Sequence, residues 1–139
     1  MKRRRQKKLT RRLVAAATFD DPGALDALLR SGADPAAPDT DGRTPLYAAS
    51  VCGHADAVRR LLEAGAPPDA ESGGLGSEGT PLCAAACWGH TETVRALLDH
   101  GADPALREDG GTGRTPLEWA RTGPYQDTVE VLLAAGAET

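Results

Sequence analysis

A Thr-Pro-Leu tripeptide occurs three times along this chain. The copies begin at Thr44, Thr80 and Thr115, so consecutive copies lie 36 and 35 residues apart. A repeat of this length indicates a stack of similar supersecondary units, because a single unit cannot bury its apolar face alone. The repeat therefore constrains the architecture before any individual residue is interpreted. It also favours an extended surface over an enclosed catalytic pocket.

An apolar triplet at helical spacing forms a second repeated feature. The triplets are Leu25, Leu28 and Leu29; Val58, Leu61 and Leu62; Val94, Leu97 and Leu98; and Val129, Leu132 and Leu133. Residues three and four apart lie on one helix face. The first triplet has no Thr-Pro-Leu before it and indicates an additional, N-terminal unit. A glycine that can adopt positive φ follows each triplet and predicts the helix end, at Gly32, Gly65, Gly101 and Gly136.

The tripeptide itself predicts the start of a helix. A threonine hydroxyl at the N-cap accepts a backbone N–H, and proline at the first helical position loses no hydrogen bond. Small residues such as Ala48-Ala49-Ser50 follow, and the Gly53-His54 and Gly89-His90 pairs break the chain before a second helix. Each unit is therefore predicted to be helix, tight turn, helix, glycine stop and polar connection.

With these features, the chain resembles the ankyrin repeat family from about Leu9 onward. The unit from Gly42 to Ala66 carries most of the family pattern, including Thr-Pro-Leu, Gly-His and Leu-Leu-Glu-Ala-Gly-Ala. The resemblance implies an all-α ankyrin-repeat solenoid of four stacked helix-turn-helix units with hairpin-like connecting loops. Its repeats would span about 9–38, 39–70, 71–106 and 107–139. The resemblance also implies a non-enzymatic role, protein recognition through the loops and the concave helix face.

The sequence departs from the family pattern in two places. The histidine that commonly follows Thr-Pro-Leu is replaced by Tyr47, Cys83 and Glu118. In the last unit the Gly-His pair becomes Pro124-Tyr125, which we expect to reshape that turn.

The net charge of −4 conceals a segregation of charge. Residues 2–12 hold eight basic side chains and no acid, so the other eight basic and 20 acidic residues leave the rest at −12. Residues 1–8 are expected to form a basic arm, either mobile or a helical extension that caps the domain at 9–139. The alternative is that Lys2 to Arg12 binds nucleic acid or another acidic surface. The arm contains no aromatic side chain among its charges, on which a nucleic-acid base could stack. This favours the mobile arm or helical cap over nucleic-acid binding.

The same sequence predicts a cytoplasmic protein with no membrane partner. No stretch approaches the roughly 20 apolar residues that span a bilayer. The apolar run from Leu13 belongs to the first predicted helix and ends at Asp20-Asp21-Pro22, which argues against an export signal. The three cysteines are an odd number, which favours free thiols over a disulfide framework.

Two motifs suggest chemistry, and neither has the context that the chemistry needs. Gly74 to Gly79 matches the Gly-x-Gly-x-x-Gly pattern of phosphate-binding loops. That pattern needs a buried strand before it, and no strand is predicted there. Cys83, Cys87 and His90 have a spacing suited to zinc, but no fourth ligand is evident. We therefore expect no catalytic residue, no metal and no cofactor.

The partner-binding surface is predicted from two features. The resemblance to ankyrin repeats implies that the residues just before each turn lie on the concave side. Trp88 is among them and is expected to be either an interface anchor or a side chain folded over its own repeat. Two connections, within 72–78 and 107–113, contain extra residues that often mark the binding face. The candidate residues for an unidentified protein partner are Trp88, Cys87, Val51, Cys52, Thr122, Asp41, Arg43, Leu75, Ser77, Glu78, Asp109 and Arg114.

Two further expectations concern the last unit. Trp119 aligns with Ala48 and Ala84 and is expected in the core. Val131 stands where the preceding units have Arg60 and Ala96, so the final outer surface is expected to be more apolar. We expect a monomer with weak self-association through that surface.

Overall fold

The computed structural model describes residues 2–74 and 79–137, and this part of the chain is helical. The helices are α1 (Lys2–Thr18), α2 (Pro22–Arg30), α3 (Pro45–Cys52), α4 (Ala55–Glu63), α5 (Pro81–Cys87), α6 (Thr91–Asp99), α7 (Glu108–Gly111), α8 (Pro116–Ala120) and α9 (Gln126–Ala134). Within the described ranges the only β pairing is an isolated bridge between Ser72 and Gly79. The predicted all-α class is confirmed.

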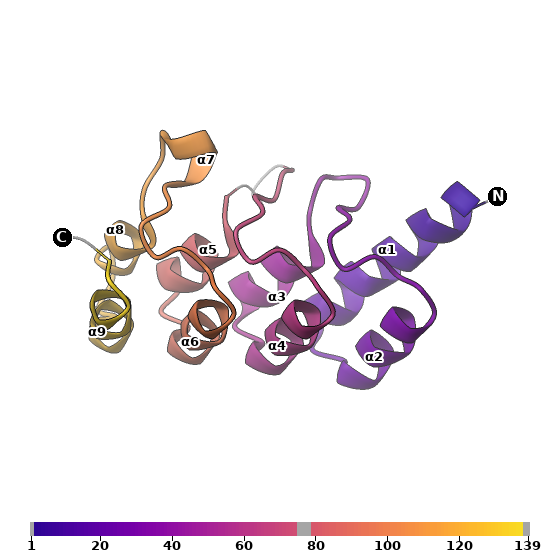
Figure 1. The fold of residues 1–139 in the computed structure, drawn as a ribbon, viewed down its shortest axis with the longest axis horizontal. Helices are drawn as coiled ribbons and strands as arrows, with labels where there is room; N and C mark the ends of the chain where they lie inside the picture. The colour runs from indigo at the N-terminus through magenta and orange to yellow at the C-terminus, as the bar shows by residue number, and fades with distance from the viewer. Residues whose placement is uncertain (1, 75–78, 138–139) are drawn as a thin grey trace.

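Four antiparallel helix pairs are stacked side by side (Figure 1). The inner helices α1, α3, α5 and α8 pack against one another in that order, and the outer helices α2, α4, α6 and α9 do the same. The connections between pairs project to one side of the stack, and α7 lies at the tip of the connection before α8 (Figure 1). The predicted four-unit solenoid is confirmed.

Thr-Pro-Leu begins an inner helix in each of its three copies. The hydroxyls of Thr44, Thr80 and Thr115 accept the backbone N–H three residues later, each at 3.1 Å. Proline follows as the first helical residue, where its missing N–H costs nothing. The predicted glycine stops are also confirmed, since Gly32, Gly65, Gly101 and Gly136 all have positive φ. Local sequence therefore determines where most helices begin and end.

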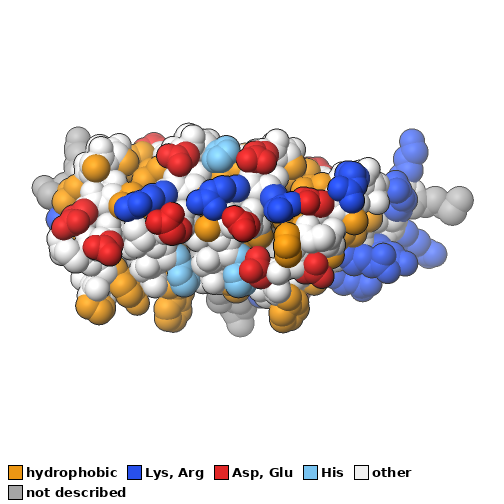
Figure 2. Space-filling model, turned by 90° about the horizontal axis from the view of Figure 1, so that it is seen from below, with side chains coloured by type: hydrophobic (Ala, Val, Ile, Leu, Met, Phe, Trp, Pro, Cys, Tyr) orange, Lys and Arg blue, Asp and Glu red, His pale blue; other side chains and the backbone are white. Residues whose placement is uncertain are grey.

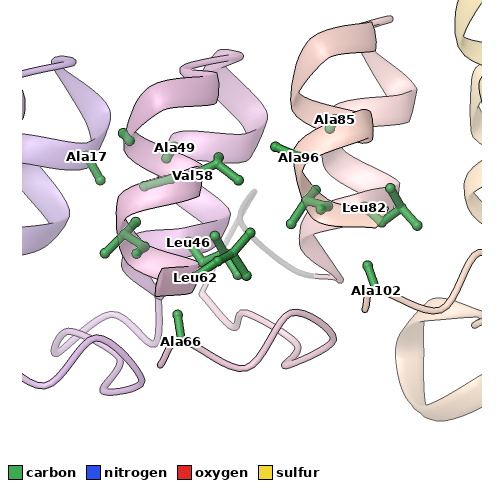
Figure 3. Packing of buried hydrophobic residues seen from close by; sticks show 14 of the residues in the cluster. Ala17, Leu46, Ala49, Val58, Leu62, Ala66, Leu82, Ala85, Ala96 and Ala102 are labelled. Carbon is green, nitrogen blue, oxygen red and sulfur yellow. The ribbon is translucent and has the colours of Figure 1, made fainter. Parts of the chain in front are cut away.

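The core is built from leucine, valine and alanine between the two helix rows (Figure 3). Ala49, Ala85 and Ala120 occupy one register of the inner helices and are fully buried. Such small side chains let neighbouring inner helices approach closely. Fully buried residues of the outer-helix triplets, among them Leu25, Leu61 and Leu97, fill the space between the rows. Because each unit packs mainly on the next, the side chains at one edge of the inner row remain available for contacts.

Two histidines link successive units. Nε2 of His54 lies 3.1 Å from the carbonyl oxygen of Thr18, and Nε2 of His90 lies 3.1 Å from that of Val51. Each imidazole therefore joins the start of an outer helix to the end of the inner helix in the preceding unit, α1 for His54 and α3 for His90. In the last unit Tyr125 takes this place, and its ring packs against Gly89.

The basic residues at the N-terminal end lie within α1, which extends past the other helices (Figure 1). All eight of these side chains, Lys2, Arg3, Arg4, Arg5, Lys7, Lys8, Arg11 and Arg12, are exposed. Arg5 donates to the carbonyl of Ser31 at 2.8 Å, and Gln6 donates to that of Gly32 at 3.3 Å. These bonds satisfy carbonyls at the end of α2, where a helix leaves acceptors unpaired.

Candidate functional site

A groove of about 490 Å³ lies where the inner helices meet the connection before α8. It is lined by Tyr47, Val51, Cys83, Ala84, Cys87, Trp88, Glu108, Asp109 and Trp119. The lining comes from α3, from α5 and the residue that follows it, and from α7 and α8, and so from three consecutive units of the stack. Three of its nine residues are aromatic, although aromatics make up only 4% of the chain.

Helical spacing places the side chains of α3 and α5 on the groove. Tyr47 and Val51 are four residues apart, as are Cys83 and Cys87, so each pair lies on one helix face. Ala84 and Trp88 have the same spacing one position further along. The small side chain of Ala84 leaves room beside the two larger aromatics from the neighbouring units.

Trp88 follows the last residue of α5 and is 58% exposed. The next residue, Gly89, has φ 69, and this left-handed turn directs the chain into α6. The Trp88 side chain is therefore exposed and is not folded over its own repeat. The indole therefore presents most of its surface to solvent at one side of the groove.

Trp119 and Glu108 also line the groove and contact each other. Trp119 is partly buried and packs against the core, and its Nε1 donates to Oε1 of Glu108 at 2.7 Å. The guanidinium carbon of Arg114 lies 4.8 Å from the centroid of the Trp119 ring, a cation–π arrangement. The indole is thus held at its edge by a carboxylate and on one face by a cation.

The connection that carries Glu108 has an unusual backbone. Asp109 and Gly110 both have positive φ, at 56 and 65 degrees. Asp is one of the few side chains that tolerate this region. Gly110 N–H donates to the two carboxylate oxygens of Glu71 at 3.2 and 3.3 Å, which ties this connection to the preceding one. The reversal brings Glu108 and Asp109 to the groove.

Burial and negative charge shape the ionisation of the groove residues. Desolvation raises the pKa of Glu108, and the nearby Asp109 and Glu71 raise it further, while the Trp119 hydrogen bond acts in the opposite direction. Burial raises the pKa of Cys83 to about 12. Burial also raises the pKa of Cys87, with Glu108 adding to the effect and Arg114 opposing it. Both thiols are therefore neutral near pH 7 and are poor nucleophiles and metal ligands.

The structure brings four of the predicted site residues together at the groove: Val51, Cys87, Trp88 and Asp109. Arg114 lies against the Trp119 ring without being a lining residue, and Cys52 and Thr122 are exposed outside the lining. Backbone N–H groups of Asp41 and Arg43 bond to Asp39 in the connection before α3, also away from the lining. Leu75, Ser77 and Glu78 lie outside the described residues, and so does most of the Gly74 to Gly79 motif.

Sequence reasoning missed five lining residues: Tyr47, Cys83, Ala84, Glu108 and Trp119. A signal existed for Tyr47 and Cys83, because both occupy the position after Thr-Pro-Leu where the family has histidine. No comparable signal existed for Glu108, since its placement depends on the left-handed backbone at the next two residues.

Phe19 is a second exposed aromatic that was missed, at 80% exposure. It precedes Asp20, whose φ of 53 makes it the counterpart of the turn glycines Gly53 and Gly89. Phe19 is therefore equivalent to Cys52 and Trp88, which lie at the ends of α3 and α5. The signal was obscured because Asp20-Asp21 stands where the two middle units have Gly-His.

Other surfaces differ in character from the groove. The face opposite the projecting connections carries side chains of both charges over the outer helices, and lysine and arginine gather at the α1 end (Figure 2). Residues 2–74 and 79–137 contain no group of three or more His, Cys, Asp or Glu side chains arranged to hold a metal ion. No helix in these ranges has the length and apolar character needed to cross a membrane.

The fold and the groove define a helical repeat solenoid with an aromatic-lined groove along its inner helices. Comparison with protein families matches the chain to ankyrin repeats (three copies) over residues 13–108 and 70–139. The chain belongs to the ankyrin repeat family. It is also 42% identical over 59 residues to the potassium channel KOR1 of Oryza sativa subsp. japonica, a match that covers 42% of this chain and 7% of that protein.

Proposed function

We propose that this protein is a non-enzymatic interaction module that binds a protein partner in the groove around Trp88. Ankyrin repeats are generally protein–protein interaction modules, and the groove supplies a specific surface for that role. The observation that carries the proposal is the 58% exposure of Trp88 in a lining that also holds Tyr47 and Trp119. Tryptophan and tyrosine are the residues most enriched at interface hot spots, where their burial gives most of the binding energy.

The rigidity of the surroundings supports the same role. Trp119 is fixed by Glu108 and Arg114, and the connection bearing Glu108 is tied to Glu71. A partner that enters a preformed groove loses less free energy to ordering of the binding site. The groove thus presents aromatic surface that needs little rearrangement before binding.

The proposed module is a monomer that comprises residues 9–139, with residues 2–8 as a helical cap at the N-terminal end. Support for the cap comes from the bonds of Arg5 and Gln6 to carbonyls at the end of α2. A cytoplasmic location is part of the proposal. It is supported by the free thiols of Cys52, Cys83 and Cys87.

Substitution of Trp88 by alanine tests the proposal. We expect Trp88→Ala to weaken partner capture from the native cell by about thirtyfold, the effect of a hot-spot truncation of about 2 kcal/mol. Helical content by circular dichroism should be unchanged, because the side chain is mostly exposed. Phe19→Ala is the matched control, since it removes an exposed aromatic outside the groove. Equal capture by wild type and Trp88→Ala would remove the groove from the proposal.

A further inference from the structure

The charged side chains that line the groove are all negative. Glu108 and Asp109 are the charged members of the lining, and Glu71 lies close enough to raise the pKa of Glu108. Within the described residues, no basic side chain forms an ion pair with Glu108 or Asp109, whereas Arg107 is paired with Glu118 at 3.0 Å. The lining therefore carries negative charge with no cation among its own residues, and the nearby Arg114 guanidinium lies against the Trp119 ring.

The aromatic members of the lining offer a second attraction for the same charge. The faces of tryptophan and tyrosine rings attract ammonium and guanidinium groups through the ring quadrupole. The molecule already contains one example, because the Arg114 guanidinium lies 4.8 Å from the Trp119 ring centroid. Arg114 is not itself a lining residue, and a second cation would meet the exposed ring of Trp88 instead.

We infer that the groove binds an arginine or lysine side chain from an extended basic segment of the partner protein. This inference rests on the proposed function. Trp88 and Trp119 would hold the aliphatic stem and the cationic head, and Glu108 and Asp109 would compensate its charge. The segment is extended because the lining runs across three consecutive units, which a chain crossing the inner helices would contact in turn.

Glu108 is suited to this role by its partial burial. Its Oε1 accepts the Trp119 indole hydrogen, so the carboxylate is held in a fixed position. Desolvation and the neighbouring acids raise its pKa, so their cost to the charged form exceeds the stabilisation from the Trp119 and Cys83 hydrogen bonds. A bound cation would stabilise that charged form further. A nucleic-acid strand would be repelled by the same acids and by the charge of −12 on residues 13–139.

Selection from a random peptide library displayed on phage tests the inference. The library would be selected on the full chain after depletion on Trp88→Ala, so that only groove-dependent peptides remain. We expect the selected peptides to be enriched in arginine or lysine. Neutral or acidic Trp88-dependent peptides would overturn the inference and leave the proposed function standing. If no Trp88-dependent peptide emerged, both would fail.

Charge substitutions at the groove provide a second readout with a synthetic hexa-arginine peptide. We expect Glu108→Gln and Asp109→Asn each to weaken binding about threefold to tenfold, and added salt to weaken it further. Gln keeps an acceptor for Trp119, and Asn tolerates positive φ, so both variants should fold. Glu63→Gln, which removes an exposed carboxylate on α4, should bind like wild type. Equal weakening by all three variants would show nonspecific attraction to the acidic body and overturn the inference.

Enrichment of peptides that match residues 2–12 would identify a second copy of this chain as the source of the basic segment. That result would contradict the expectation of a separate partner. Sedimentation at several concentrations would then show dimers that Trp88→Ala abolishes.

Discussion

At the residue scale, Cys83 shows how burial determines the chemistry of a side chain. It occupies the position after Thr-Pro-Leu, is almost fully buried, and its Sγ lies 3.5 Å from the carbonyl oxygen of Arg114. Burial raises its pKa to about 12, since a thiolate there would lose its hydration without gaining a cation. The residue that a zinc hypothesis would need is therefore a neutral core thiol.

The raised pKa of Cys83 predicts a loss of stability at alkaline pH. The pKa of this thiol is about 12 in the folded protein and returns to its ordinary value of 9.0 in the unfolded chain, so unfolding releases a proton between these values. The free energy of unfolding should therefore fall as pH rises above about 9, by up to about 1.4 kcal/mol per pH unit. Urea denaturation at several pH values would show a shallower decline for Cys83→Ala. Equal slopes in the two proteins would contradict the prediction.

At the element scale, the tight turn between α3 and α4 depends on the next unit. Gly53 has φ 75, and a Cβ at this position would lie 2.6 Å from Nδ1 of His90. The same imidazole bonds to the carbonyl of Val51. Gly53 is thus required for two reasons. It adopts the left-handed backbone conformation, and its lack of a side chain leaves room for the His90 ring that joins two units.

A double-mutant cycle separates these two requirements. Gly53→Ala should cost about 1 kcal/mol for its positive φ and about 1 kcal/mol more for displacing His90 from its hydrogen bond. In a His90→Ala background only the first cost should remain, so the coupling free energy would be about 1 kcal/mol. Urea unfolding of the four proteins measures it. Additive effects of the two substitutions on the free energy of unfolding would mean that the imidazole moves aside without losing its hydrogen bond.

Most helices could be predicted from the sequence, whereas the groove could be predicted only in part. Thr44, Thr80 and Thr115 cap helices through contacts three residues away, so a short motif is sufficient. Trp119 and Glu108 meet across 11 residues through the left-handed turn at Asp109, which no short pattern indicates. Trp88 was predicted because its place in the repeat is regular. Its exposure depended on the tertiary structure.

At the scale of the whole molecule, the stack is close to one-dimensional. α6 packs against α4, α5 and α9, whereas α9 packs against α6 and α8. In such an architecture, stability is approximately the sum of contributions from each unit and from each interface between neighbours. A perturbation in a middle unit therefore weakens two interfaces, and one in the last unit weakens a single interface.

Leu97 and Leu132 allow this property to be tested, because they are equivalent, fully buried leucines in α6 and α9. Either leucine-to-alanine change should cost about 2–5 kcal/mol through lost burial and the cavity left behind. Hydrogen exchange should show the loss for Leu132→Ala confined to α8 and α9, because the remaining units keep their own interfaces. Leu97→Ala should lower protection on both sides of α6, including the groove helices α5 and α8. Uniform loss of protection in both variants would instead show that the four units unfold as a single cooperative block.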